Sequence, residues 1–152
     1  GWSVVERFLF STEEDEPERL YKLLMKNGMY DDERTCLGSS LLHICVLQNR
    51  PLSTSLLITM GYSVNCVNDF EETPLHWAVK AGYPGICSLL ITHGANVNKE
   101  DVDGNTPLHW ACEYENEGIV KLLLAAKALP NYENESGQTP VHVAIVNGYK
   151  KV

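Results

Sequence analysis

The sequence has no hydrophobic run long enough to cross a membrane. Its longest apolar stretches, Ser88 to Thr92 and Val120 to Ala126, fall far short of the roughly 18 to 20 residues that a membrane helix needs. The first residues also lack the charged and apolar regions of a signal peptide. We therefore expect neither a membrane-spanning segment nor a secretory leader.

Basic residues are also few. The 152 residues include 12 Lys and Arg against 20 Asp and Glu, which gives a formal net charge of -8. A chain of this charge lacks the attraction to phosphates that drives non-specific binding to nucleic acids and anionic membranes. We expect no nucleic-acid partner and no direct membrane insertion. The hydrophobic fraction of 44% is that of an ordinary globular domain.

The cysteines lack the patterns of metal sites and redox pairs. There are five, an odd number, and none forms a Cys-x-x-Cys pair. Several lie in apolar runs, where a reduced thiol packs as a small hydrophobic group. This usage favours an intracellular, cytoplasmic location, with the nucleus also open. The five are Cys36, Cys45, Cys66, Cys87 and Cys112.

Catalytic patterns are missing as well. The sequence contains no GxGxxG and no GxxxxGK[ST] phosphate-binding loop, and no cysteine has the surroundings of a thiol protease. We expect no enzymatic activity, no catalytic residue and no cofactor. The acidic run at 13–16 is interpreted as a solvated loop.

A repeat of 33 residues dominates what is present. Thr-Pro-Leu-His occurs at 73–76 and again at 106–109, a Thr-Pro-Val-His variant follows at 139–142, and a degenerate Ser-Leu-Leu-His copy stands at 40–43. Three near-copies in one register are strong evidence of a repeat architecture.

Each copy predicts a pair of helices. Thr106 is a good N-cap, and Pro107 after it has no N–H to leave unpaired. Gly94 is a suitable C-cap for the helix before it, and 94–106 is rich in turn residues. We predict first helices near 41–48, 74–81, 107–114 and 140–147, and second helices near 51–60, 84–93 and 117–126.

These residues resemble the ankyrin repeat, over roughly residues 16–152. The resemblance implies an all-α fold, a solenoid of helix-turn-helix units with β-hairpin fingers, with about four repeats plus a divergent N-terminal cap. We expect one domain over 1–152. Its parts are the cap at 1–37, repeats at 38–70, 71–103 and 104–136, and a truncated repeat at 137–152, which predicts a longer protein.

The sequence departs from the family pattern at four positions. Leu41 replaces the proline that opens a first helix, Glu71 replaces a finger glycine, and Lys127 replaces a C-cap glycine. Pro130 stands where Val97 stands in the preceding repeat. The match to the family pattern is therefore weakest at the start of the first repeat, in the finger that contains Glu71 and in the finger that contains Lys127 and Pro130.

One histidine recurs in each repeat, which raises the possibility of a metal site. Equivalent positions in stacked repeats are about 8 to 10 Å apart, whereas metal ligands must converge within about 2 Å of one ion. We therefore expect no metal, and we predict that the histidines tie each helix start to the neighbouring finger. They are His43, His76, His109 and His142.

The resemblance also implies a binding surface. Fingertips and exposed residues of the first helices form the concave side, which carries most partner contacts in the family. Trp77 and Trp110 share one register position and serve either in packing or in ligand contact. The candidate protein-binding residues are Asp69, Phe70, Glu72, Trp77, Lys80, Val102, Asp103, Asn105, Trp110, Glu113, Tyr114, Glu135 and Gln138, with Ala81, Ser136, Val146 and Asn147 at the remaining equivalent positions.

Acidic residues outnumber basic ones at these positions, which predicts an electronegative groove with aromatic anchors. We expect a monomer that binds a basic or amphipathic protein or peptide. Two functions stay open: a scaffold or adaptor module, and a regulatory or substrate-docking domain of a larger multidomain enzyme.

Overall fold

The computed structural model describes residues 4–11, 14–27 and 40–148. All regular secondary structure in these ranges is helical. The helices are α1 (Val4–Ser11), α2 (Pro17–Asn27), α3 (Leu41–Leu47), α4 (Pro51–Thr59), α5 (Pro74–Ala81), α6 (Pro84–Thr92), α7 (Pro107–Glu113), α8 (Glu117–Ala125) and α9 (Pro140–Val146). Expectations for Cys36, for the boundary at 37/38 and for 150–152 lie outside the described residues.

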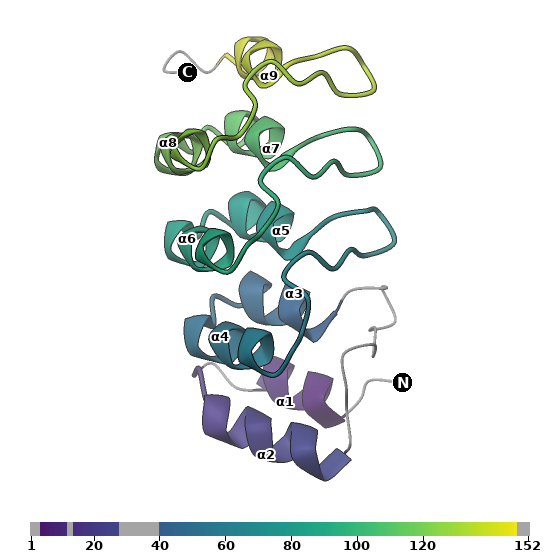
Figure 1. The fold of residues 1–152 in the computed structure, drawn as a ribbon, viewed down its shortest axis with the longest axis vertical. Coiled ribbons are helices and arrows are strands. Elements are labelled where there is room, and N and C mark those ends of the chain that lie inside the picture. Colours follow the sequence, from purple (N-terminus) through teal and green to yellow (C-terminus); the bar gives the residue numbers. More distant parts are fainter. Residues whose placement is uncertain (1–3, 12–13, 28–39, 149–152) are drawn as a thin grey trace.

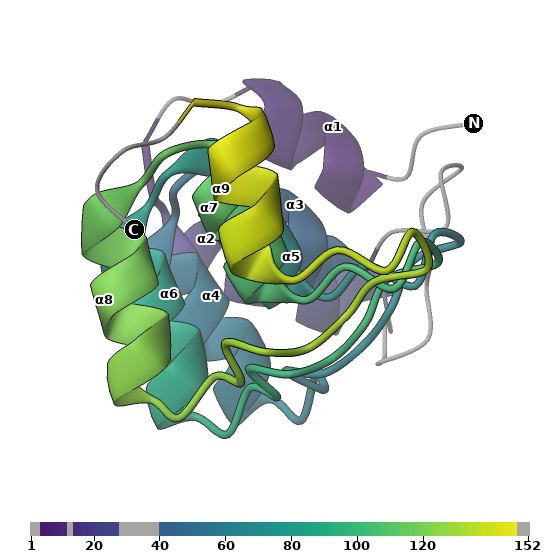
Figure 2. The ribbon, with the colours of Figure 1, turned by 90° about the horizontal axis from the view of Figure 1, so that it is seen from above.

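The helices form a stack of antiparallel pairs. Figure 1 shows α3 with α4, α5 with α6 and α7 with α8 as successive layers, with α1 and α2 at one end and α9 at the other. Seen from above, the second helices line one side, the first helices lie in the middle, and the loops before α5, α7 and α9 project together to the other side (Figure 2). We call these three loops, 61–73, 94–106 and 127–139, the first, second and third fingers.

The first helices begin where the sequence predicts, because each has a reciprocal capping box. The N-caps are Ser40, Thr73, Thr106 and Thr139. In each case the side chain of the histidine three residues later accepts a hydrogen bond from the backbone N–H of the cap. In α5 the Thr73 N–H donates to His76 Nδ1 at 3.1 Å. The predicted helix starts are confirmed, and the ends fall within one residue of the expected positions.

The expected β-hairpin geometry of the fingers is not confirmed, because none of the described residues lies in a strand. At the tip of the second finger Asp101 N–H donates to Asn105 C=O at 2.9 Å, and Asn68 with Glu72 and Asn134 with Gln138 repeat this bond. The carbonyl of Asp101 also accepts the N–H of Gly104 at 3.0 Å, so the backbone bonds are those of a tight turn at the tip and not of a β-ladder along the arms.

The departures from the family pattern leave the backbone regular. Glu71 and Lys127 adopt the left-handed conformation, with φ of 58° and 69°, like the glycines in equivalent places. Leu41 begins α3 without a proline, and its side chain is fully buried. The start of α3 and the fingers at Glu71 and Lys127 thus keep the backbone conformation of the other repeats.

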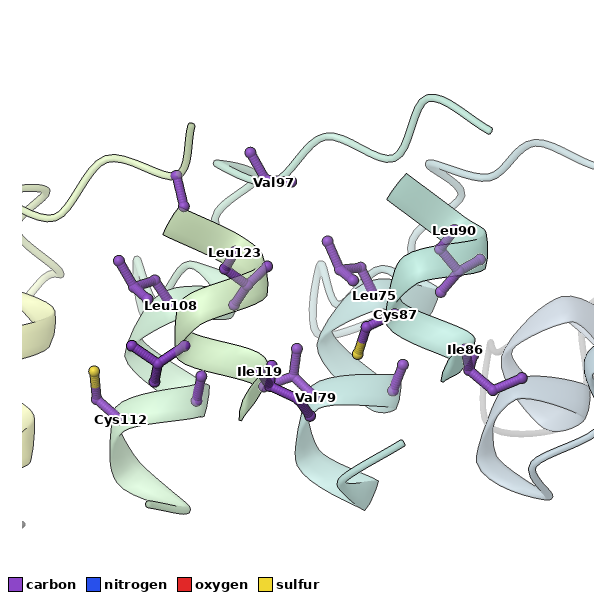
Figure 3. Packing of buried hydrophobic residues seen from close by; sticks show 14 of the residues in the cluster. Leu75, Val79, Ile86, Cys87, Leu90, Val97, Leu108, Cys112, Ile119 and Leu123 are labelled. Atoms are coloured by element: carbon purple, nitrogen blue, oxygen red, sulfur yellow. The ribbon is translucent and has the colours of Figure 1, made fainter. Parts of the chain in front are cut away.

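The core runs continuously through the repeats. Leu75 and Leu108 occupy equivalent positions on first helices, and Ile86 and Ile119 do so on second helices; all four are buried (Figure 3). A smaller cluster joins α1 and α2 to the first repeat. Because each layer covers the apolar side of the next, stability comes largely from contacts between neighbours.

The acidic run at the N-terminal end contributes to this attachment, which corrects its interpretation as a solvated loop. The carboxylate of Asp15 accepts the backbone N–H groups of Leu52 and Ser53 at 2.7 and 3.0 Å. Arg50, which is buried, donates to the carbonyl of Leu9 at 3.0 Å. Polar contacts thus connect α1 and α2 to the start of α4.

Candidate protein-binding surface

The repeated histidines attach each finger to a first helix. Nε2 of His76 lies 3.0 Å from the carbonyl oxygen of Asn105, and Nε2 of His109 lies 2.9 Å from that of Gln138. His43 makes the same contact with Glu72 at 2.8 Å. These bonds confirm the predicted role for three of the four histidines.

The chemistry of this bridge requires a neutral imidazole. Nδ1 of each ring accepts the N–H of the capping threonine, so the proton lies on Nε2, which donates to the finger carbonyl. Burial lowers the pKa of His76 and of His109 below the ordinary value of 6.5, against the opposing effect of the backbone hydrogen bond. The second and third fingers are therefore each held by a group that is uncharged at neutral pH.

A side chain inside each fingertip sets its shape. Oδ1 of Asp101 accepts the N–H groups of Asp103 and Asn105 at 3.0 and 2.8 Å. Asn68 and Asn134 make the same pair of bonds in the other two fingers. These three residues were not among the predicted ones, although an Asn or Asp recurs there every 33 positions.

Neighbouring fingertips contact each other through the backbone. Val102 N–H donates to Phe70 C=O at 3.0 Å, and Glu135 N–H donates to Asp103 C=O at 3.0 Å. The tips therefore form a row in which each supports the next.

The tryptophans pack against the core and hold the fingers. Trp77 Nε1 donates to the Glu72 carboxylate at 2.6 Å, and Trp110 Nε1 donates to Asp101 at 3.0 Å. Both indoles are half-buried against core residues. Glu72 thus supports Trp77, and the packing interpretation of the tryptophans is supported; ligand contact stays a prediction.

The outer side of Trp110 carries a small stack of side chains. The ring of Tyr114 lies parallel to it, with centroids 5.8 Å apart and an interplanar angle of 6°. The Lys80 ammonium lies 5.6 Å from the centroid of the Trp110 indole. The one predicted basic residue of the surface is therefore held by a cation–π contact.

Five of the predicted residues meet in one hollow of about 350 Å³. It lies between the second and third fingers and the helices α7 and α9. The predicted residues in its lining are Asp103, Asn105, Glu113, Glu135 and Gln138, and the rest of the lining is Asn134, Ser136, Val143, Val146 and Asn147. We call this hollow the finger groove.

The other eight predicted residues lie outside the finger groove. Phe70 and Val102 are well exposed at 60% and 57%, next to each other at the row of fingertips, and Tyr114 is 46% exposed. Asp69 is also exposed on the first fingertip. The remaining four, Glu72, Trp77, Lys80 and Trp110, make the contacts within the protein described above.

Reactive chemistry is not evident at this surface. Among the residues that the structure describes, no group of His, Cys, Asp and Glu could hold a metal ion. Burial raises the pKa of Cys45 and Cys87 to about 12 and that of Cys112 to about 11. These thiols stay protonated at neutral pH and are poor nucleophiles.

Comparison with known proteins agrees with this architecture. The family model for ankyrin repeats, which describes three copies of the unit, matches residues 11–101, 42–134 and 100–152. A comparison with curated proteins gives no match. Within the described ranges, no helix has the length and apolar character to span a membrane. The matched ranges cover most of the sequence, and the chain belongs to the ankyrin-repeat family.

Proposed function

We propose that the chain is a scaffold or adaptor module that binds a basic or amphipathic protein segment in the finger groove. Ankyrin repeats are generally protein–protein interaction modules. The proposal adds the chemistry of the partner to that general role, and it takes the module to act as an intracellular monomer.

The lining of the finger groove is the observation that carries the proposal. Asp103, Glu113 and Glu135 are exposed acids from two fingers and α7, and no basic side chain lines the hollow. Val143 and Val146 on α9 add apolar surface beside them. A lysine or arginine can lay its aliphatic stem on such valines while its charged end reaches the carboxylates.

The exposed side chains outside the hollow extend this surface. Phe70, Val102 and Tyr114 are large apolar groups that stay accessible on a rigid frame of fingers and helices. Aromatic anchors commonly carry much of the affinity of an interface, while charges around them set the encounter rate. An extended segment with alternating basic and apolar residues would use both.

A matched pair of charge reversals tests the proposal. Glu113 and Glu133 are both exposed acids of the third repeat, but only Glu113 lines the finger groove. We expect Glu113→Lys to weaken binding of a fluorescent lysine- and leucine-rich peptide about tenfold at low salt, with little change for Glu133→Lys. Fluorescence anisotropy measures both affinities. Equal affinity of both variants and the unmodified protein would contradict the finger groove as the binding site.

A further inference from the structure

Three successive second helices on the side opposite the fingers, α2, α4 and α6, carry a single acidic residue, Glu18 in the first turn of α2. Neither α4 (Pro51–Thr59) nor α6 (Pro84–Thr92) contains a charged residue, and α2 contains no acid from Arg19 onward. These helices lie next to one another in the stack (Figure 1). In a chain with 20 acids and a net charge of -8, this side differs sharply from the finger side.

Beyond Glu18, all the charged residues of α2 are positive. Lys22 and Lys26 are one helical turn apart, both are exposed, and neither forms an ion pair among the described residues. Arg19 is also exposed, although it lies 3.7 Å from Glu16 and over the ring of Phe8. The two lysines therefore form a local positive stripe.

Apolar side chains accompany the lysines. Tyr21 and Met25, also one turn apart on α2, are 44% and 56% exposed, and Leu52 on α4 is 60% exposed. A hollow of about 280 Å³ between the two helices is lined by Pro17, Glu18, Tyr21, Lys22 and Leu56. An exposed group of large apolar residues beside charged ones is typical of an interaction site.

We propose that this second surface, formed by Tyr21, Lys22, Met25, Lys26, Leu52 and Leu56, binds an acidic amphipathic helix of a partner protein. The apolar face of that helix would cover Tyr21, Met25 and the hollow next to Leu56. Its acids would face Lys22 and Lys26. Charge complementarity selects this occupant, because Lys22 and Lys26 attract an acidic segment and α4 and α6 carry no charge that repels it. Glu18 is the one acid among the residues that line the hollow.

The two surfaces of the molecule thus have opposite preferences. The finger groove is acidic and favours basic segments, whereas the surface over α2 and α4 favours acidic ones. A protein with both can join two partners of opposite charge without competition between them. This second interface does not depend on the function proposed for the finger groove.

Two synthetic helical peptides test the proposal. Both have the same leucine face, and all their remaining positions are glutamate in one peptide and lysine in the other. Binding is measured by fluorescence anisotropy. We expect the double variant Lys22→Glu with Lys26→Glu to bind the glutamate peptide about tenfold more weakly. Its affinity for the lysine peptide should not change. Asp103→Lys with Glu113→Lys should leave the glutamate peptide unaffected. Failure of the lysine peptide alone would count only against the finger groove.

Matched single variants separate charge from apolar contact. Lys22→Glu and Lys127→Glu make the same charge change at exposed lysines, and only Lys22→Glu should weaken the glutamate peptide. Met25→Ala should weaken it severalfold with little dependence on salt. The proposal is overturned if all variants bind the glutamate peptide alike. It is also overturned if the two lysines are needed for binding phosphatidylserine vesicles or for self-association in sedimentation, and not for this peptide.

Discussion

At the scale of single residues, the histidines show how one side chain can serve two elements. The imidazole of His76 caps α5 through Nδ1 and holds the second finger through Nε2. Protonation of Nδ1 would remove the acceptor of the Thr73 N–H and place a charge in a buried site. His109 repeats this arrangement one layer further along.

The free energy of unfolding should therefore fall as the pH drops below 6.5. The folded state holds the pKa of His76 and His109 below the ordinary value, so the unfolded chain binds more protons in this range. The contribution of the two histidines to the free energy of unfolding is fully present well above pH 6.5 and is lost progressively toward pH 5. The loss is at most about 1.4 kcal/mol per pH unit for each histidine. Urea unfolding between pH 7 and 5 measures the slope.

Replacing a histidine by glutamine, which does not titrate, provides the control for the dependence of stability on pH. His76→Gln is expected to lower stability at every pH but to reduce the decrease between pH 7 and 5. An unchanged slope in His76→Gln and in His109→Gln would show that other groups cause the pH dependence.

Two glycines at equivalent fingertip positions allow a second comparison between single residues. Gly104 and Gly137 both have positive φ, at 75° and 72°. A Cβ on Gly104 would lie 2.8 Å from the Glu135 nitrogen, whereas nothing lies within 4 Å of one on Gly137. Alanine at either site should cost about 1 kcal/mol for its conformation.

Gly104→Ala should cost at least about 1 kcal/mol more than Gly137→Ala, because it also separates two neighbouring fingertips. Thermal unfolding of both variants gives the difference. Equal destabilisation would mean that the contact between fingertips contributes nothing to stability.

At the scale of elements, the sequence predicted helices well and fingers less well. The helix starts were accessible because a threonine cap, a proline and a histidine recur at fixed spacing in 73–76, 106–109 and 139–142. The shape of the fingers was less accessible, because the turn at each tip is held by a side chain whose only sequence signal is an Asn or Asp every 33 positions. No periodicity of apolar residues reports the two bonds that Asp101 accepts.

The contact of Asp15 with α4 was equally hidden, because it joins residues 37 and 38 positions apart. The N-cap residue of α4, Arg50, gives that helix no side-chain cap bond. Asp15 supplies the acceptor from the preceding unit instead. A carboxylate at a helix N-terminus also interacts favourably with the helix dipole.

Asp15→Ala should therefore destabilise the protein by about 1 to 2 kcal/mol. The neighbouring Glu16 makes only a long surface ion pair of 3.7 Å with Arg19, so Glu16→Ala should change stability by less than about 0.5 kcal/mol. Guanidinium unfolding of both variants measures the two costs. A loss from Glu16→Ala as large as that from Asp15→Ala would contradict the capping role.

At the scale of the whole molecule, the fold separates charges that the sequence intersperses. The fingers that line the finger groove project from one side of the first helices, and α4 and α6 lie on the other side (Figure 2). Neither α4 nor α6 contains an acidic residue. The thirteen candidate residues could be placed on the concave side from the repeat register alone. Their division into a hollow, a stack of rings and structural supports could not, because it depends on contacts such as that of Trp77 with Glu72.

Binding kinetics should distinguish the acids of the finger groove from its aromatic neighbour. Asp103 and Glu113 line the hollow and are exposed, so they act on an approaching basic segment mainly through long-range attraction. Asp103→Lys with Glu113→Lys should slow association and flatten its dependence on salt. Tyr114 is held rigidly against Trp110, so Tyr114→Ala should chiefly accelerate dissociation by removing a preorganised contact. Surface plasmon resonance with a lysine- and leucine-rich peptide measures both rates, and circular dichroism checks that the variants are folded. Unchanged association and dissociation rates in both folded variants would mean that the basic partner binds elsewhere.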